Sequence, residues 1–139
     1  MTDPSRVYAR SFTIPADAID ENGHVNNVAY VQWMQDIAVE HYASIGGIEA
    51  QGPDATWVIR EHRIEYFLPA FAGEEIEIRT WVENVRRVRS LRKYEFVRKT
   101  DGKVLVKGET DWVFVDTRTG VPRAIPEEVS KIFALSQEK

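Results

Sequence analysis

The stretch Asp20-Glu21-Asn22-Gly23-His24-Val25-Asn26-Asn27 runs directly into the longest helical pattern of the chain. Side chains of one stripe recur there at spacings of three and four: Tyr30, Met34, Ile37, Ala38, His41 and Ile45. This spacing predicts an amphipathic helix, with Asn26 or Asn27 as its N-cap and Gly46-Gly47 at its end. Acid, amide and imidazole groups thus precede a helix N-terminus, where free N–H groups favour negative charge. This position before the helix therefore suits chemistry on a carbonyl group.

The bulk composition predicts one folded domain over residues 1–139. Net charge is −4 and the pI is near 5.4, which argues against nucleic-acid binding. The absence of cysteine excludes disulfides, thiolate catalysis and thiolate zinc sites. Residues 1–6 show no apolar leader, and no apolar run reaches the ~18 residues that a membrane span needs. The expected location is therefore the cytoplasm.

The remaining chain predicts an α+β order. Alternating patterns indicate strands at residues 7–14 and 74–85, and further strands are expected at 57–68, which is mixed in polarity, at 91–99 and at 104–115. Asp101-Gly102 is a hairpin turn signal, residues 46–55 resemble a loop, and residues 126–135 resemble a short closing helix. One antiparallel sheet with a long helix on one face is the expected architecture. Such a thin fold leaves a face or an edge unprotected, and three tryptophans (Trp57, Trp81 and Trp112) lie in strands, so we expect a homodimer or a homotetramer.

Each candidate residue also has a purely structural interpretation. Asp20 can stabilise the turn before the helix, and Asn22 and Asn26 can serve turn geometry. His41 is expected in a core or an interface, and the histidine spacing matches no metal motif, so no metal site is predicted. A run of basic residues spans the end of one strand and the start of the next. It is either a solvated strand end or a place that binds phosphates. Its members are Arg86, Arg87, Arg89, Arg92 and Lys93.

Three motifs resemble those of the hotdog-fold acyl thioesterases. The first is Asp20-x-Asn22-Gly23-His24-Val25-Asn26-Asn27-x-x-Tyr30-x-x-Trp33, similar to the 4-hydroxybenzoyl-CoA thioesterase group and to plant acyl-carrier-protein (ACP) thioesterases. The second is Tyr66-Phe67-Leu68-Pro69-Ala70-x-x-Gly73-Glu74, and the third is Val113-x-Val115-Asp116 followed by Gly120-x-Pro122. The likeness covers nearly the whole chain.

The resemblance implies a hotdog fold, in which a curved antiparallel sheet wraps a long helix, and dimers with sites at the interface. It implies hydrolysis of an acyl-CoA or acyl-ACP thioester with no separate cofactor. Asp20, Asn22 and His24 would be catalytic, with Asp20 as general base or nucleophile. The helix N-terminal amides would polarise the thioester carbonyl. Substrate binding would fall to Val25, Asn26, Asn27 and Tyr30, and to Arg89-Ser90, which resembles a pair that binds nucleotide phosphates.

Two departures from the family pattern keep a second hypothesis open. Ala18 stands where the 4-hydroxybenzoyl-CoA branch has its catalytic aspartate, and Pro69 stands where the plant enzymes have a further acid. A non-catalytic protein that binds acyl-CoA or acyl-ACP is therefore the alternative. The sequence leaves open the acyl group, the carrier and the exact role of Asp20.

Overall fold

The computed structural model describes residues 7–133. The strands are β1 (Val7–Thr13), β2 (Ala55–Tyr66), β3 (Glu75–Arg86), β4 (Arg89–Arg98) and β5 (Val104–Asp116). A 3-10 turn, η1 (Ala16–Ala18), precedes the long helix α1 (Asn27–Ser44), and two short helices follow, α2 (Gly47–Gln51) and α3 (Glu127–Ile132). The expected α+β order is present.

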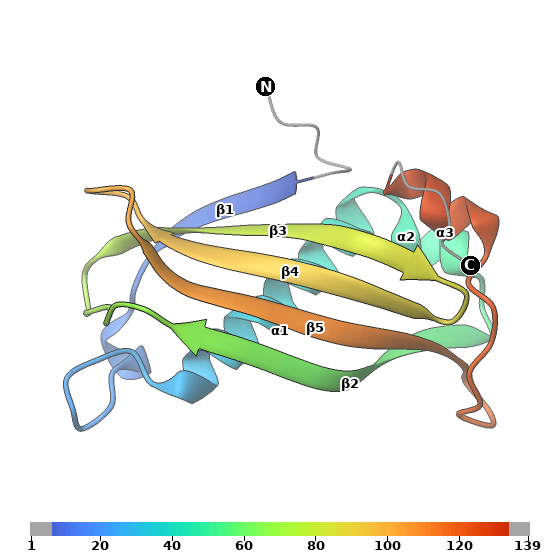
Figure 1. Cartoon of the computed structure of the whole chain (residues 1–139), viewed down its shortest axis with the longest axis horizontal. Helices are drawn as coiled ribbons and strands as arrows, with labels where there is room; N and C mark the ends of the chain where they lie inside the picture. The colour runs from blue at the N-terminus through green and yellow to red at the C-terminus, as the bar shows by residue number, and fades with distance from the viewer. Residues whose placement is uncertain (1–6, 134–139) are drawn as a thin grey trace.

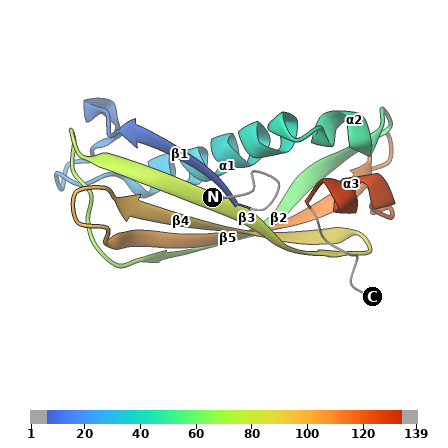
Figure 2. The same ribbon diagram turned by 90° about the horizontal axis from the view of Figure 1, so that it is seen from above.

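The five strands form one antiparallel sheet in the order β1-β3-β4-β5-β2 (Figure 1). The strand register shifts in three pairs, between Ile59 and Glu61, between Val82 and Asn84, and between Phe96 and Val97. Such bulges increase twist and bend the sheet. Figure 2 shows α1 running along one face of this curved sheet, with α2 following it at the end where α3 lies. β1 and β2 are the two edge strands.

The inward stripe of α1 packs on the sheet as its spacing predicts. Tyr30, Met34, Ile37, Ala38 and His41 are all buried. The facing side chains come from alternating positions of β3 and β4 and from β5, because side chains of a strand point to opposite faces in turn. These are Ile76, Ile78, Tyr94, Phe96, Leu105 and Val106. This layer fixes α1, and with it the turn that precedes the helix.

The helices differ from the sequence prediction at two places. The closing helix predicted over residues 126–135 is α3 (Glu127–Ile132), and residues 134 and 135 of that prediction lie outside the described residues. Residues 47–51, expected in a loop, form α2. Gly46 has a φ of 85°, and α1 ends just before it, as the Gly46-Gly47 pair predicted. Gly47 then starts α2 against the ring of Tyr42, a contact so close that a Cβ atom would collide with it. A pair of glycines therefore reverses the chain and begins a new helix.

The connection between β3 and β4 is shorter than the sequence suggested. Only Arg87 and Val88 lie between the two strands, and Arg87 has a φ of 41°. Arg89 and Ser90 consequently belong to β4, where successive side chains alternate between the two faces.

The tryptophans on which the expected assembly partly rested are only half-exposed in the protomer. Trp57 packs edge-on against Phe114 and its indole N–H donates to the Tyr42 hydroxyl at 3.1 Å. The indole N–H of Trp81 donates to Glu83. Trp57 and Trp81 therefore have hydrogen-bond partners within the chain, and the edge strand β2 is the stronger reason to expect assembly.

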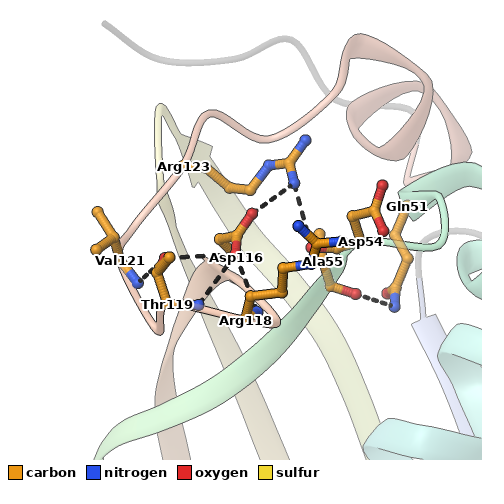
Figure 3. A network of polar contacts seen from close by, with 8 residues as sticks. All are labelled: Gln51, Asp54, Ala55, Asp116, Arg118, Thr119, Val121 and Arg123. Carbon is orange, nitrogen blue, oxygen red and sulfur yellow. Dashed lines mark hydrogen bonds and ion pairs between the residues drawn. The ribbon is translucent and has the colours of Figure 1, made fainter.

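The far end of the sheet is fixed by a network around Asp116, drawn in Figure 3. The Asp116 carboxylate accepts from the backbone N–H groups of Arg118 and Thr119 and from the Arg123 guanidinium, which also donates to the carbonyl of Asp54. Burial is slight, and these hydrogen bonds, first those from the backbone, lower the pKa of Asp116. The network ties the end of β5 to the start of β2.

Candidate functional site

The organising stretch folds as a tight turn between η1 and α1. Ile19 and Val25 form an antiparallel bridge. Inside it, the Asp20 N–H donates to the His24 carbonyl at 2.8 Å, and the Gly23 N–H donates to the Asp20 carbonyl at 3.0 Å. Gly23 has a φ of 82°, which glycine adopts without strain. The turn therefore has a backbone scaffold of its own.

The carboxylate of Asp20 both stabilises this turn and keeps one oxygen available. Its Oδ1 accepts from the Asn22 N–H at 2.9 Å and lies 3.4 Å from the His24 N–H. The turn-stabilising role considered from the sequence is thus real. The second oxygen, Oδ2, makes no hydrogen bond to residues 7–133, and Asp20 is only half-buried. The carboxylate of Asp20 is therefore held in place on a partly exposed residue, with one oxygen left without a hydrogen bond in the described chain.

The N-terminus of α1 offers free amides directly after the turn. The N–H groups of Val25 and Asn26 are already used, by the carbonyls of Ala70 and Ala18. Asn26 is the N-cap, and its Oδ1 accepts from the Ala29 N–H at 2.8 Å. Within the described chain, the N–H groups of Asn27 and Val28 have no acceptor. Of the amides at Val25 to Asn27 that were expected to bind a carbonyl, that of Asn27 is therefore available in the described chain. The amide of its neighbour Val28 is available as well.

The other side chains of the predicted site lie at different depths. Asn22, His24 and Asn27 are exposed, and the His24 imidazole packs edge-on against Phe71 with ring centroids 5.3 Å apart. Val25 is buried and Tyr30 is 2% exposed. The structure brings Asp20, Asn22 and His24 into one turn, whereas Tyr30 lies beneath it in the core.

Tyr30 is buried among aromatic rings below the turn. Its ring contacts Trp33, Tyr66 and Phe96 edge-on. Burial raises the pKa of Tyr30 to about 12, with smaller contributions from Tyr66 and Glu74. Its phenol is neutral at physiological pH, so Tyr30 supports the helix end as an uncharged packing residue.

The side chains of Arg89 and Ser90 lie on opposite faces of the sheet. The Arg89 guanidinium is half-exposed and is bound by Asp111, with Nη2 to Oδ2 at 2.6 Å and Nε to Oδ1 at 3.3 Å. The Ser90 hydroxyl is buried on the other face and donates to the Asn84 carbonyl at 3.0 Å. The two side chains do not meet, and any phosphate contact would be made by Arg89 alone in competition with Asp111.

One residue of the basic run is not at a solvated strand end. Arg92 is 4% exposed, and its Nη1 donates to Nδ1 of His41 at 2.9 Å and to Oγ1 of Thr80 at 3.1 Å. Arg92 lines a cavity of about 230 Å³ between the sheet and the C-terminal half of α1. Its position in the alternation Ser90, Arg92, Tyr94, Phe96, shared with buried aromatic residues, is the sequence signal that marks it as inward-facing.

The described chain holds neither a cluster of metal ligands nor a membrane-spanning helix. Residues 7–133 contain no group of three histidine, aspartate or glutamate side chains that could hold a metal ion. None of the described helices is long and apolar enough to span a membrane.

Comparison with known proteins identifies the family. The sequence model described as the thioesterase-like superfamily matches residues 14–133. The chain belongs to this superfamily. No curated protein matches it.

Solved structures show the same fold as this thioesterase-like protein. A 12:0-ACP thioesterase from Umbellularia californica is 21% identical with a TM-score of 0.83, and the match covers 95% of this chain and 51% of that one. A 1,4-dihydroxy-2-naphthoyl-CoA thioesterase from Synechocystis is 14% identical with a TM-score of 0.80, covering 92% and 96%. A Staphylococcus aureus protein in complex with CoA is 17% identical with a TM-score of 0.82, covering 96% and 89%. The fold is the hotdog fold expected from the motifs.

The two departures from the family motifs occupy different environments in this thioesterase-like chain. The Ala18 methyl group belongs to the buried core under α1, and its carbonyl accepts from the Asn26 N–H. Pro69 is exposed, next to the buried Ala70 that holds the Val25 N–H. Neither position supplies an acid, so Asp20 is the carboxylate that the motif places in the turn.

Proposed function

We propose that this protein is an acyl thioesterase that hydrolyses an acyl-CoA or acyl-ACP thioester to the free acid and the thiol. The observation that carries the proposal is that one hydrogen-bonded turn joins the Asp20 carboxylate, with one oxygen unbonded to residues 7–133, to the Asn27 and Val28 amides, which also have no acceptor among those residues. Membership of the thioesterase-like superfamily supports it.

The chemistry assigns one role to each group. The thioester carbonyl accepts from the Asn27 and Val28 amides, which stabilise the negative charge that develops on its oxygen. Asp20 removes a proton from water as the water adds to the carbonyl carbon, or it adds to that carbon itself and forms a mixed anhydride that water then hydrolyses. In both routes the C–S bond breaks and the sulfur leaves as a thiol. Asn22 and His24 orient the water or the carbonyl.

The assembly that we propose is a homodimer, or a homotetramer built from it, formed through β2. This edge strand spans Ala55–Tyr66 and pairs only with β5 within the protomer. A long unpaired edge readily adds another strand, and Val58 and Tyr66 expose apolar surface on it. Tyr66 contacts Tyr30 below the turn, so a partner at this edge would lie beside the site. Light scattering should give at least twice the chain mass of 16.0 kDa.

The alternative function is acyl-CoA or acyl-ACP binding without hydrolysis. The observation that favours it is that Asp20 Oδ1 already accepts from the Asn22 and His24 N–H groups, a sufficient structural reason for an aspartate in this turn. Under this alternative, acyl thioesters bind and no thiol is released.

The deciding experiment measures free thiol released from a panel of acyl-CoA and acyl-ACP thioesters that differ in chain length and in aromatic or aliphatic character. Turnover by the wild-type protein that is lost in Asp20→Ala supports the proposed activity. Binding of acyl-CoA without thiol release would establish the alternative. We expect the protein in the cytoplasm, where both carriers occur.

A further inference from the structure

We infer that the cavity beneath the C-terminal half of α1 binds a small apolar carboxylate, whose carboxylate group pairs with Arg92. The argument rests on a buried guanidinium that faces an apolar cavity and has no acidic partner among residues 7–133.

The hydrogen bonds of Arg92 leave much of its guanidinium unused. Both of the bonds that Arg92 makes to side chains of residues 7–133 come from Nη1 and go to uncharged groups, the His41 ring and the Thr80 hydroxyl. An arginine carries five N–H donors, and within the described chain Nε and Nη2 make no hydrogen bond. These two nitrogens form the fork that binds a carboxylate with two parallel bonds.

Within residues 7–133, no acidic side chain neutralises the charge of Arg92. Arginine cannot accept a hydrogen bond, so Nδ1 of His41 must accept from it, and His41 is therefore neutral. Desolvation lowers the pKa of Arg92 to about 10, which still leaves the group charged at neutral pH. Buried charges in proteins are normally paired. An anion in the cavity would supply the missing partner.

The rest of the cavity fits an apolar body. Its walls include the rings of Tyr42, Trp57, Trp112 and Phe133. A cavity of about 150 Å³ can hold benzene, so the volume of about 230 Å³ here suits a ring with a short side chain.

The walls are held in place before any ligand arrives. The Tyr42 hydroxyl donates to Gln51 Oε1 at 2.8 Å and accepts from Trp57 at 3.1 Å. Gln51 Nε2 donates to the Ala55 carbonyl, beside the Asp116 network (Figure 3). Because such order is already present, a ligand loses less affinity to ordering of the site. Tyr42 is fifteen residues beyond Asn27, roughly 20 Å along the helix, so within one protomer this cavity and the Asp20 turn are separate.

The inference is tested with an isosteric pair of probes, 3-phenylpropanoate and 3-phenylpropanamide, titrated calorimetrically into the full-length protein at pH 7. A charge-assisted pair with Arg92 should make the acid bind on the order of 10- to 100-fold more tightly than the amide. Equal affinities for the two probes, or no binding of the acid at millimolar concentration, would overturn the inference.

Variants locate the binding. Arg92→Met keeps much of the side-chain volume and should abolish the preference for the acid, whereas Arg79→Met, on the exposed face of β3, should keep it. Should Arg92→Met not fold, tryptophan fluorescence locates the ligand instead. The change induced by the acid should shrink in Trp57→Phe and Trp112→Phe and persist in Trp81→Phe. Loss of the signal only in Trp81→Phe would place the ligand elsewhere and refute the inference.

A final comparison identifies where the carboxylate comes from, and it rests on the proposed thioesterase activity. Hexanoyl-CoA and adipoyl-CoA differ by a distal carboxylate. A preference for adipoyl-CoA that is lost in Arg92→Met assigns the carboxylate to the acyl group of a substrate cleaved at the Asp20 turn of another protomer, because a six-carbon chain is too short to join the two places within one protomer. Equal rates, together with binding of 3-phenylpropanoate, assign the site to a free acid. Both results support the carboxylate site, and the calorimetric result stands even where no thioester is cleaved.

Discussion

The two ends of α1 present opposite kinds of polar site. At its N-terminus, the Asp20 turn holds a carboxylate, an amide and an imidazole at the surface, and backbone N–H groups fix the carboxylate. Near its C-terminus, Arg92 is buried among rings and, within residues 7–133, bonded only to neutral side chains. The first site is negative and exposed, and the second is positive and buried. Water screens the charge at the first site, whereas at the second the protein alone must balance it.

At the exposed Asp20 turn we expect charge to affect function, whereas at the buried Arg92 we expect charge to affect the stability of the fold. Removing an exposed group from the Asp20 turn should leave the fold intact and change only chemistry. Removing a partner of Arg92 should cost stability, because a buried charge then loses a hydrogen bond. The following predictions test this division, beginning with the largest effect.

The largest effect is expected for Asp20→Asn, which keeps the shape of the turn and removes the charge. Loss of a general base typically lowers the rate on the order of 10²–10⁴-fold. We expect a fall of this size in kcat for thioester hydrolysis, with little change in KM or in the unfolding free energy. His24→Ala should cost less, since Asp20 would still act on water.

Glu21→Gln is the matched control for Asp20→Asn. It removes a neighbouring exposed carboxylate from the same turn and should leave kcat within about twofold, an effect on the scale of 0.5 kcal/mol. Full turnover by a folded Asp20→Asn protein would show that Asp20 only shapes the turn. The exposed Glu61 and Glu65 and the Glu40 carboxylate, which is paired with Arg10, would then be tested as the acid.

Burial shifts the pKa of Tyr30 and that of Arg92 in opposite directions, because it disfavours the charged form of each. With a pKa of about 12 in the folded protein against 10.0 ordinarily, Tyr30 keeps its proton between these pH values while the unfolded chain loses it. The unfolding free energy therefore falls as pH rises through this window, by on the order of 2–3 kcal/mol for two pKa units. Arg92, with its lowered pKa, acts with the opposite sign above about pH 10.

Urea unfolding of wild-type protein and Tyr30→Phe at pH 9 and pH 11.5 measures this contribution. The variant should lose less stability between the two pH values than the wild type does. Tyr66→Phe, which removes an exposed phenol, should change the difference much less. An identical pH dependence in wild type and Tyr30→Phe would show that the Tyr30 phenol is not held in its neutral form.

A smaller stability effect is expected at the Arg92 end for Thr80→Val. The Thr80 hydroxyl accepts from Arg92 and donates to the Lys93 carbonyl at 2.9 Å. Valine keeps the shape but leaves both groups without this partner, at a cost of about 1–3 kcal/mol. Asn22→Ala, an exposed change in the Asp20 turn, should stay within about 0.5 kcal/mol. Equal costs in denaturant unfolding would remove the contrast between the two ends of α1.

The same contrast explains what the sequence could predict. Period-two alternation predicted β3 most clearly, and helical spacing predicted the inward stripe of α1. The sequence left the N-cap open between Asn26 and Asn27, and the structure has Asn26. The turn was recognisable because Asp20, Asn22 and His24 lie within five consecutive positions. Arg92 was grouped with the basic residues beside it, since charge identifies a run and says nothing of the face on which each side chain lies. α2 was missed because two glycines and a proline nearby obscured a helix of five residues.

The smallest effect concerns Arg89, and it tests whether the exposed face of the sheet binds the nucleotide of CoA. Arg89 is half-exposed and already paired with Asp111, which also contacts Arg60 at 3.5 Å. A phosphate must compete with that carboxylate, and exposed ion pairs contribute about 0.2–1 kcal/mol. Arg89→Ala should therefore raise KM for an acyl-CoA by only about two- to fivefold at low salt, with kcat unchanged, because a remote contact binds ground and transition states alike. The matching N-acetylcysteamine thioester, which lacks the nucleotide, should be unaffected, as should acyl-CoA hydrolysis by Arg79→Ala. An unchanged KM for acyl-CoA in Arg89→Ala would remove Arg89 from the binding surface and leave the two ends of α1 as the places where charge matters.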